Sequence, residues 1–382
     1  MLNVNTPLPI EKGSVPISTP RLLVYRELVE ENISLLRRHL ESVVPGSGFR
    51  HLATHVKTHK SAWAARKQLD AGITKYKCTL NELDMTLEAG AKDVFVAYPL
   101  VAHDADRVAR AVATHRDARI TAQVASLTHA ERLAEAARRH EVEIDCLIDI
   151  DVGNHRTGIA PGAAPELVRA IRRSPRLGVL RVRGLHAYDG HNSSPDAAIR
   201  EACAEKAMKE VVDCAREVEQ AGTKVERIVT GGSPAFLPDL RELVVRHKVD
   251  AEIDVSPGTW IYWDSNYEAK MPGLFRCAAV LLAQVMDRPA PDLATLNLGH
   301  KRWAIDHGPV TAFSLPGVEV VSTSEEHTVL RLPAGVNAEL EDYVQFVPRH
   351  VCPTVNLWET FTIVGPGGKI ETLAEPVTGR NR

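Results

Sequence analysis

Two lysines and two histidines lie within seven residues, in the segment Thr54-His55-Val56-Lys57-Thr58-His59-Lys60. The apolar pattern over residues 49–56 predicts a short β-strand that ends at Lys57. A partly desolvated lysine amine is nucleophilic at neutral pH and can condense with an aldehyde. Lys57 stands at the strand end, whereas Lys60 begins the next helix, so Lys57 is the better candidate for such a nucleophile.

Two residues of metal-ligand type, His350 and Cys352, are separated by a single residue. In an extended segment the side chains at i and i+2 point to the same side, so we expect these two to reach one ion. A His/Cys pair suits Zn²⁺ or another borderline transition metal better than Mg²⁺ or Ca²⁺. Two protein ligands would leave coordination positions open for water and substrate, as a catalytic metal requires.

Two turns that contain glycine could bind a phosphate group. Unhindered backbone N–H groups are the usual donors to phosphate in such turns. The candidate residues are Gly231, Gly232 and Ser233 in the first turn, and Ser256, Gly258 and Thr259 in the second.

The elements that must position these residues alternate between strand and helix. From Arg21 to about residue 255, short apolar runs alternate with segments whose apolar residues recur at helical spacing, and Asn81 is expected to cap one of these helices. This alternation implies parallel strands joined by helical crossovers. About eight such units predict a (β/α)₈ barrel, which usually takes about 250 residues. A doubly wound open sheet is the alternative, but no GxGxxG follows the first strand.

The candidate residues fall where a barrel of this kind carries its active site. Catalytic groups of (β/α)₈ barrels lie at the C-terminal ends of the strands, and phosphate is often held after the last two strands. Lys57 and the two glycine turns occupy such positions.

After about residue 266 the helical periodicity fades, and short β-like runs are broken by Pro and Gly. We therefore expect three parts. These are an N-terminal extension at 1–18 that packs on the β domain, a barrel at 19–265, and a C-terminal all-β domain at 266–382 that carries the candidate metal ligands His350 and Cys352.

The composition excludes several classes of protein. A net charge of −3 gives no sign of a nucleic-acid partner, and no apolar run approaches the roughly 20 residues of a membrane span. The N-terminus shows no signal-peptide pattern. The six cysteines form no CxxC pair, so we expect a reducing compartment and a cytoplasmic protein without disulfides.

The chain resembles a known family along roughly residues 18–360. The resemblance is to the D-threonine aldolase / D-serine dehydratase family, fold-type III pyridoxal-phosphate (PLP) enzymes related to the alanine racemase N-terminal domain. The segments that carry it, in order, lie at 55–60, 72–78, 149–158, 184–191, 231–234, 256–259, 324–327 and 350–354.

The resemblance implies roles for individual residues. Lys57 would hold PLP covalently, with His55 and Tyr188 beside the cofactor, Arg156 near its ring and the two glycine turns at its phosphate. His350 and Cys352 would hold a divalent metal, Zn²⁺ or Mn²⁺. Some aldolase relatives carry Asp where this chain has Cys352, whereas D-serine dehydratases carry Cys.

The expected reaction is cleavage of a D-β-hydroxy amino acid by a retro-aldol reaction to glycine and an aldehyde. In it the metal would bind the β-hydroxyl group and His191 would take its proton, directly or through water. The alternative is a D-serine-type dehydratase, in which Lys57 takes the α-proton and a 2-oxo acid and ammonia form. More remote alternatives are an amino-acid racemase and a non-catalytic PLP-binding protein. The resemblance further implies a homodimer.

Overall fold

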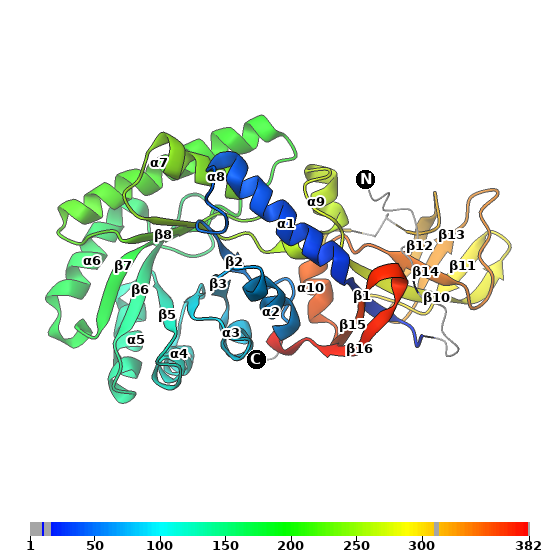
Figure 1. Ribbon diagram of the computed structural model, residues 1–382, viewed down its shortest axis with the longest axis horizontal. Coiled ribbons are helices and arrows are strands. Elements are labelled where there is room, and N and C mark those ends of the chain that lie inside the picture. The colour runs from blue at the N-terminus through cyan, green and yellow to red at the C-terminus, as the bar shows by residue number, and fades with distance from the viewer. Residues whose placement is uncertain (1–9, 11–16, 309–312, 381–382) are drawn as a thin grey trace. The chain divides into compact units, whose positions relative to one another are not determined.

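The computed structural model of the chain describes residues 10, 17–308 and 313–380. The chain divides into two compact units (Figure 1). The barrel unit comprises Arg37–Lys57 and Ala64–Gly258, and the sheet unit comprises the chain up to Leu36, Thr58–Trp63 and Thr259–Arg380.

The barrel unit is built on eight parallel strands that pair in chain order from β2 to β9. A parallel bridge between Leu52 and Val255 joins the last strand to the first. The prediction of a (β/α)₈ barrel is therefore confirmed, and the open sheet is excluded. The strands are β2 (Ala53–His55), β3 (Lys75–Cys78), β4 (Asp93–Val96), β5 (Arg119–Val124), β6 (Ile144–Ile150), β7 (Leu180–Ala187), β8 (Arg227–Thr230) and β9 (Glu252–Val255).

Helices connect the strands and lie outside them, as Figure 1 shows for α4 to α7. The helices that follow β2 to β8 are α2 (Ala62–Asp70), α3 (Leu80–Glu88), α4 (Ala102–Thr114), α5 (Leu127–Arg139), α6 (Ala164–Arg173), α7 (Ala197–Gln220) and α8 (Phe236–Leu240). Our expectation that Asn81 caps a helix is wrong. The N-cap of α3 is Thr79, whose side chain forms a capping box with Glu82.

The barrel interior is layered because alternate residues of each strand point inward. An apolar layer contains Phe95, Leu147 and Val229 from β4, β6 and β8. The ion-paired residues Lys75, Arg227 and Asp254 lie on one side of this apolar layer. Residues nearer the C-terminal strand ends form the polar layer described below.

The sheet unit is a second sheet of eight strands, in the order β12-β13-β11-β10-β1-β15-β16, with β14 also paired to β10. Its first strand comes from the chain's N-terminal part and pairs with β10 and β15. The strands are β1 (Arg21–Tyr25), β10 (Ala279–Ala290), β11 (Leu293–Leu296), β12 (Glu319–Thr323), β13 (Thr328–Arg331), β14 (Tyr343–Phe346), β15 (Thr360–Val364) and β16 (Ile370–Pro376). The remaining helices are α1 (Arg26–Val43), α9 (Ser265–Lys270) and α10 (Val351–Asn356).

Most of the predicted N-terminal extension, residues 1–9 and 11–16, lies outside the described residues. At its end, the backbone N–H of Ile17 donates to Tyr343 Oη at 3.0 Å. The borders that we expect after residues 18 and 265 stay predictions. Across the described ranges, no helix has the length and apolar character needed to cross a membrane.

Candidate functional site

Lys57 follows β2 by two residues and is half-buried. Its backbone N–H donates to Nδ1 of His55 at 3.3 Å. The backbone N–H of the buried His55 donates to the carbonyl oxygen of Pro257 at 3.0 Å. The end of β2 is therefore tied to the second glycine turn. The strand is shorter than the predicted 49–56, since the chain enters a turn directly after His55.

Lys60, the competing lysine, is buried in the sheet unit. Its Nζ donates to the carbonyl oxygen of Gly379 at 3.4 Å. This contact gives Lys60 a structural role, which supports the choice of Lys57.

A buried hydrogen-bonded chain crosses the barrel near the C-terminal strand ends. Lys77 Nζ lies 2.8 Å from His186 Nε2 and 3.0 Å from Ser256 Oγ. His186 Nδ1 lies 2.7 Å from Asp149 Oδ1, and Gln123 donates to the other oxygen of that carboxylate at 2.6 Å. Because a carboxylate accepts, the proton of the neutral imidazole is on Nδ1, and Nε2 accepts from Lys77.

Burial sets the charges of the side chains in this hydrogen-bonded series. Desolvation lowers the pKa of Lys77 to about 7; the charges of Lys57 and Arg156 act in the same direction, against Asp149 and Asp189. Burial and the charge of Lys77 lower the pKa of His186 to about 4, so this imidazole is neutral at pH 7. A lysine that titrates near neutral pH is typical of functional sites.

Tyr188 presents its ring to two cationic side chains. The Arg156 guanidinium lies 4.6 Å from the ring centroid and Lys77 Nζ lies 5.4 Å from it. A Cβ at Gly232 would lie 3.2 Å from Tyr188 Cε2, and one at Gly190 would lie only 2.3 Å from Cε1. Glycine at both positions therefore makes room for this ring, which is half-buried rather than part of the core.

The two glycine turns are joined by Ser256. Its hydroxyl lies 2.9 Å from the carbonyl oxygens of Thr230 and Gly231, so one residue links the end of β8 with the end of β9. Gly231 has a φ of +73°, and Ser233 in the same turn and Gly258 in the second turn are both buried. The first turn needs glycine because a left-handed backbone strains any residue with a Cβ.

His191 lies in the loop after β7 and is exposed. Its ring packs against the loop after β6, since a Cβ at Gly153 would lie 3.2 Å from His191 Nε2. Asp151 shapes that second loop by accepting hydrogen bonds from the backbone N–H groups of Gly153 and His155, at 3.0 and 2.9 Å. Partial burial lowers the pKa of His191, although the charge of Asp151 opposes it, so the ring can act as a base near neutral pH.

His350 and Cys352 lie in the sheet unit, but their segment is not extended as we expected. His350 is the N-cap of α10, and Cys352 lies in the first turn of that helix. The two side chains nevertheless interact. Burial alone would lower the pKa of His350, but hydrogen bonds and negative charge from Cys352 and Asp306 raise it to about 9.

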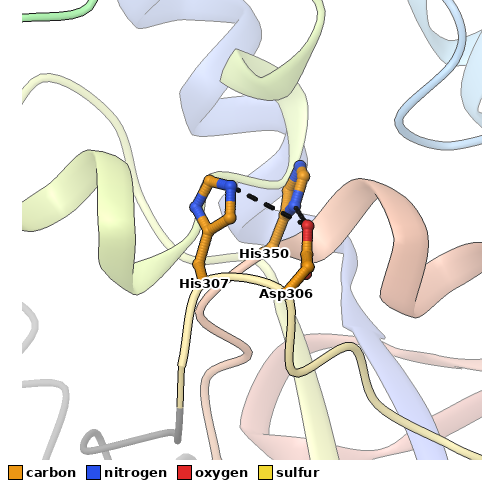
Figure 2. Close-up of side chains that lie close together, drawn as sticks. All are labelled: Asp306, His307 and His350. Carbon is orange, nitrogen blue, oxygen red and sulfur yellow. Dashed lines mark hydrogen bonds and ion pairs between the residues drawn. The ribbon is translucent and has the colours of Figure 1, made fainter.

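Asp306 and His307, from the loop that follows β11, extend this cluster (Figure 2). Asp306 Oδ2 lies 2.6 Å from His350 Nδ1 and 3.8 Å from His307 Nε2. In Figure 2 the other ring nitrogen of His350 points away from Asp306. This is the arrangement in which a carboxylate fixes the tautomer of a metal-binding histidine and leaves Nε2 as the ligand atom.

Thr259, which we predict at the phosphate, belongs to the sheet unit and also lies near Cys352. Its Oγ1 is 3.7 Å from Cys352 Sγ, and Thr58 Oγ1 is 3.1 Å from the same sulfur. Two hydroxyl groups therefore lie close to the sulfur atom of Cys352, one of the two predicted metal ligands.

The residues present fit both groups that the sequence predicts. The barrel unit offers PLP an amine at Lys57, a glycine turn without side chains, and the face of Tyr188 backed by Arg156. The sheet unit offers an imidazole and a thiol with hydroxyl neighbours, a donor set suited to Zn²⁺ and similar ions.

Sequence reasoning missed the roles of Lys77, His186, Asp149 and Asp306. Lys77, His186 and Asp149 lie in segments that carry the family resemblance, yet their contacts join β3, β6 and β7. Asp306 is 44 residues from His350. The available signal was alternation, since a lysine in a barrel strand whose immediate neighbours face outward must itself point inward and be buried or paired.

Comparison with known proteins identifies the family of this chain. A family model described as "Alanine racemase, N-terminal domain" matches residues 25–265, and one described as "Putative serine dehydratase domain" matches residues 278–364. A D-threonine aldolase from an Arthrobacter species is 27% identical over 94% of this chain and 93% of that protein. A D-threo-3-hydroxyaspartate dehydratase from Delftia sp. (strain HT23) is 24% identical over 93% of this chain and 96% of that protein.

Solved structures give the same result for the fold. The crystal structure of D-threonine aldolase from Filomicrobium marinum matches with a TM-score of 0.83 and 26% identity, over 95% of this chain and 96% of that one. The alanine racemase family model, which matches the barrel, alone spans more than half of the sequence, and the serine dehydratase family model matches part of the sheet unit. The chain therefore belongs to the alanine racemase N-terminal domain family of fold-type III proteins, and within it to the group of the D-threonine aldolases and D-serine dehydratases.

Proposed function

We propose that this protein is a lyase dependent on PLP and a divalent metal, and that it cleaves D-β-hydroxy amino acids such as D-threonine to glycine and an aldehyde. The observation that carries the proposal is that one chain contains both residues suited to hold PLP and residues suited to hold a metal ion. The barrel unit holds a lysine at a strand end with glycine turns, and the sheet unit holds a His/Cys pair. The aldolase relatives named above support the choice of reaction.

The barrel residues have distinct roles in this proposal. Lys57 and His55 hold and orient the cofactor, Tyr188 and Arg156 cover its ring, and the turns of Gly231–Ser233 and Ser256–Thr259 bind its phosphate. When bound, PLP withdraws electrons from the α-carbon and so stabilises the negative charge left there when a bond breaks.

The remaining residues act on the β-hydroxyl group. His350 and Cys352 hold the ion, Zn²⁺ or Mn²⁺, which lowers the pKa of a hydroxyl group that it binds. Asp306 orients His350, and His191 accepts the hydroxyl proton. A homodimer in the cytoplasm remains part of the proposal.

A dehydratase is the second candidate, and Cys352 favours it because the resemblance places Cys at this position in the D-serine dehydratases. The dehydratase relative at 24% identity shows that both reactions occur among similar proteins. A racemase has no use for a metal at the β-hydroxyl group, so we do not propose it.

A product assay separates these reactions. Purified protein with PLP and Mn²⁺ or Zn²⁺ is given D-threonine, and the products are identified by mass spectrometry. Glycine with acetaldehyde supports the aldolase, whereas 2-oxobutanoate with ammonia supports the dehydratase. L-Threonine serves as the control and should not react. Failure to bind PLP through Lys57 would contradict both.

A further inference from the structure

Lys77 is the buried amine at the centre of the barrel's polar layer, and the proposed reaction assigns it no role. Only 3% of the residue is exposed. Its Nζ donates to His186 Nε2 and to Ser256 Oγ, at 2.8 and 3.0 Å. These bonds use two of the three hydrogen positions of the amine. The third is a proton in the ammonium form and a lone pair in the neutral form.

The contacts of Lys77 do not favour one charge state strongly. Within the described residues, no carboxylate oxygen is hydrogen-bonded to its Nζ; the carboxylate of Asp149 is hydrogen-bonded to His186, which in turn is bonded to Lys77. The charged groups around it are Lys57 and Arg156, which oppose protonation, and Asp149 and Asp189, which favour it. Burial adds to the opposition and brings the pKa of Lys77 to about 7.

Ser256 connects this amine with the two glycine turns. The Ser256 hydroxyl contacts Lys77 Nζ on one side and the carbonyl oxygens of Thr230 and Gly231 on the other, at 2.9 Å each. Lys77 is thus one hydroxyl group away from the backbone proposed to bind phosphate. A phosphate dianion at those turns would bring two negative charges close to a half-neutral amine in a site of low dielectric, which favours the ammonium form.

We propose that Lys77 takes up a proton from solvent when a phosphorylated ligand binds at the glycine turns, so that its full positive charge exists only in the loaded barrel. The neutral amine supplies the lone pair, the proton comes from water or buffer, and no other bond changes. The inference rests on the proposed function in taking these turns as the phosphate site of PLP. It adds a charge-compensating residue that the reaction itself does not require.

Calorimetric titration with 4′-deoxypyridoxine 5′-phosphate tests this coupling. The probe carries the ring and the phosphate but has no aldehyde to react with Lys57. Titrations at pH 8 in two buffers of different ionisation enthalpy give the number of protons taken up. The phosphate is already a dianion at this pH, since its second pKa is about 6. We expect close to one proton per site at pH 8 and far less at pH 6, where Lys77 is already charged before binding.

Two variants identify the group that is protonated. Lys77→Met should lose the uptake and bind the probe about tenfold more weakly at pH 7. Lys77→Arg keeps a charge that cannot be lost, so it should bind with little uptake and with an affinity that does not change between pH 7.5 and 9. In the wild type the affinity should fall by up to tenfold per pH unit over this range. Lys92→Met, at an exposed lysine, is the control and should behave as wild type.

The outcomes separate the inference from the proposed function. No uptake by the wild-type protein at pH 8, or equal uptake by wild type and Lys77→Met, would overturn the role of Lys77 while PLP still gave a visible band dependent on Lys57. If neither PLP nor the probe bound to folded wild-type protein, the proposed function and the inference would fail together.

Discussion

Three lysines of the barrel unit show how surroundings decide what the same side chain can do. Lys75 lies in β3 and is ion-paired with Asp254 and, at 3.0 Å, with Glu252, so it is held as a charged structural group. Lys77, two residues on in the same strand, has only neutral hydrogen-bond partners, and its pKa falls to about 7. Lys57 is half-buried beyond a strand end, and it is the lysine that we propose holds the cofactor.

Replacement of Lys57 tests its assignment as the nucleophile. Lys57→Ala should lose the visible absorbance of bound PLP and reduce activity by about 10³-fold or more, because it removes the amine proposed to hold PLP covalently. Absorbance spectra of the PLP-loaded protein measure the first effect. Lys60→Ala is the matched control and should keep the band. A band that survives in Lys57→Ala but disappears in Lys60→Ala would reverse the assignment.

Asp306 should matter for metal affinity although it is not assigned as a ligand. Asp306→Asn removes the carboxylate that holds His350 Nδ1 at 2.6 Å, and we expect metal affinity to fall about 10- to 100-fold. Competition with a chelator, followed by elemental analysis, measures the change. His350→Ala should lose the metal altogether. His307→Ala should have a small effect; a loss as large as that of His350→Ala would mean that His307 is itself a ligand.

At the scale of single elements, the spacing of apolar residues predicted most of the barrel, because the buried face of each strand or helix is visible in its own sequence. It failed where a distant residue decides the local structure. The His350–Cys352 segment was expected to be extended, but Asp264 accepts from the backbone N–H of Val351 at 3.1 Å from 87 residues away, and a helix starts there. Pro353 in the first helical turn was an available signal of this start.

The turn after β8 should bind PLP more weakly when its second glycine gains a side chain. A Cβ in Gly232→Ala would approach Tyr188 Cε2 to 3.2 Å and displace the ring that is proposed to cover the cofactor. We expect PLP binding to weaken by about tenfold, or roughly 1.4 kcal/mol, with an unchanged melting temperature of the ligand-free protein. Fluorescence or absorbance titration with PLP measures it. Gly162→Ala has open space around its Cβ and should bind PLP normally; equal binding by both variants would contradict the role of the turn.

At the scale of the whole molecule, the barrel buries ionisable groups whose partners come from several strands. Phe95, Leu147 and Val229 separate the ion pairs of Lys75 and Arg227 from the chain of Lys77, His186 and Asp149. The alternation of inward- and outward-facing residues predicts that polar residues of these strands point into the barrel. It cannot tell which pair is charged and which is neutral, since that depends on partners from β6, β7 and β9. The sequence therefore predicted the barrel but not its polar layer.

The neutral state of buried His186 has a consequence for the stability of the whole fold in acid. Its pKa is about 6.5 in an unfolded chain and about 4 in the folded protein, because burial and the charge of Lys77 disfavour the imidazolium. Between these values the unfolded state binds more protons, so the stability due to this residue is full above pH 6.5 and is lost as the pH falls toward 4. The difference between these two pKa values corresponds to a loss of at most about 3 to 4 kcal/mol.

Urea unfolding of wild type and His186→Gln from pH 7 to pH 4.5 isolates this contribution. Asp189 and Asp264, whose pKa values are raised to about 6 chiefly by burial, act in the opposite direction, so the total stability curve mixes several groups. They are present in both proteins and cancel in the difference. We expect wild type to lose stability relative to His186→Gln as the pH falls, while His103→Gln, at an exposed histidine, follows wild type. A difference that stays constant with pH would mean that His186 is not held neutral in the folded barrel, and that the charge of Lys77 is set by other groups.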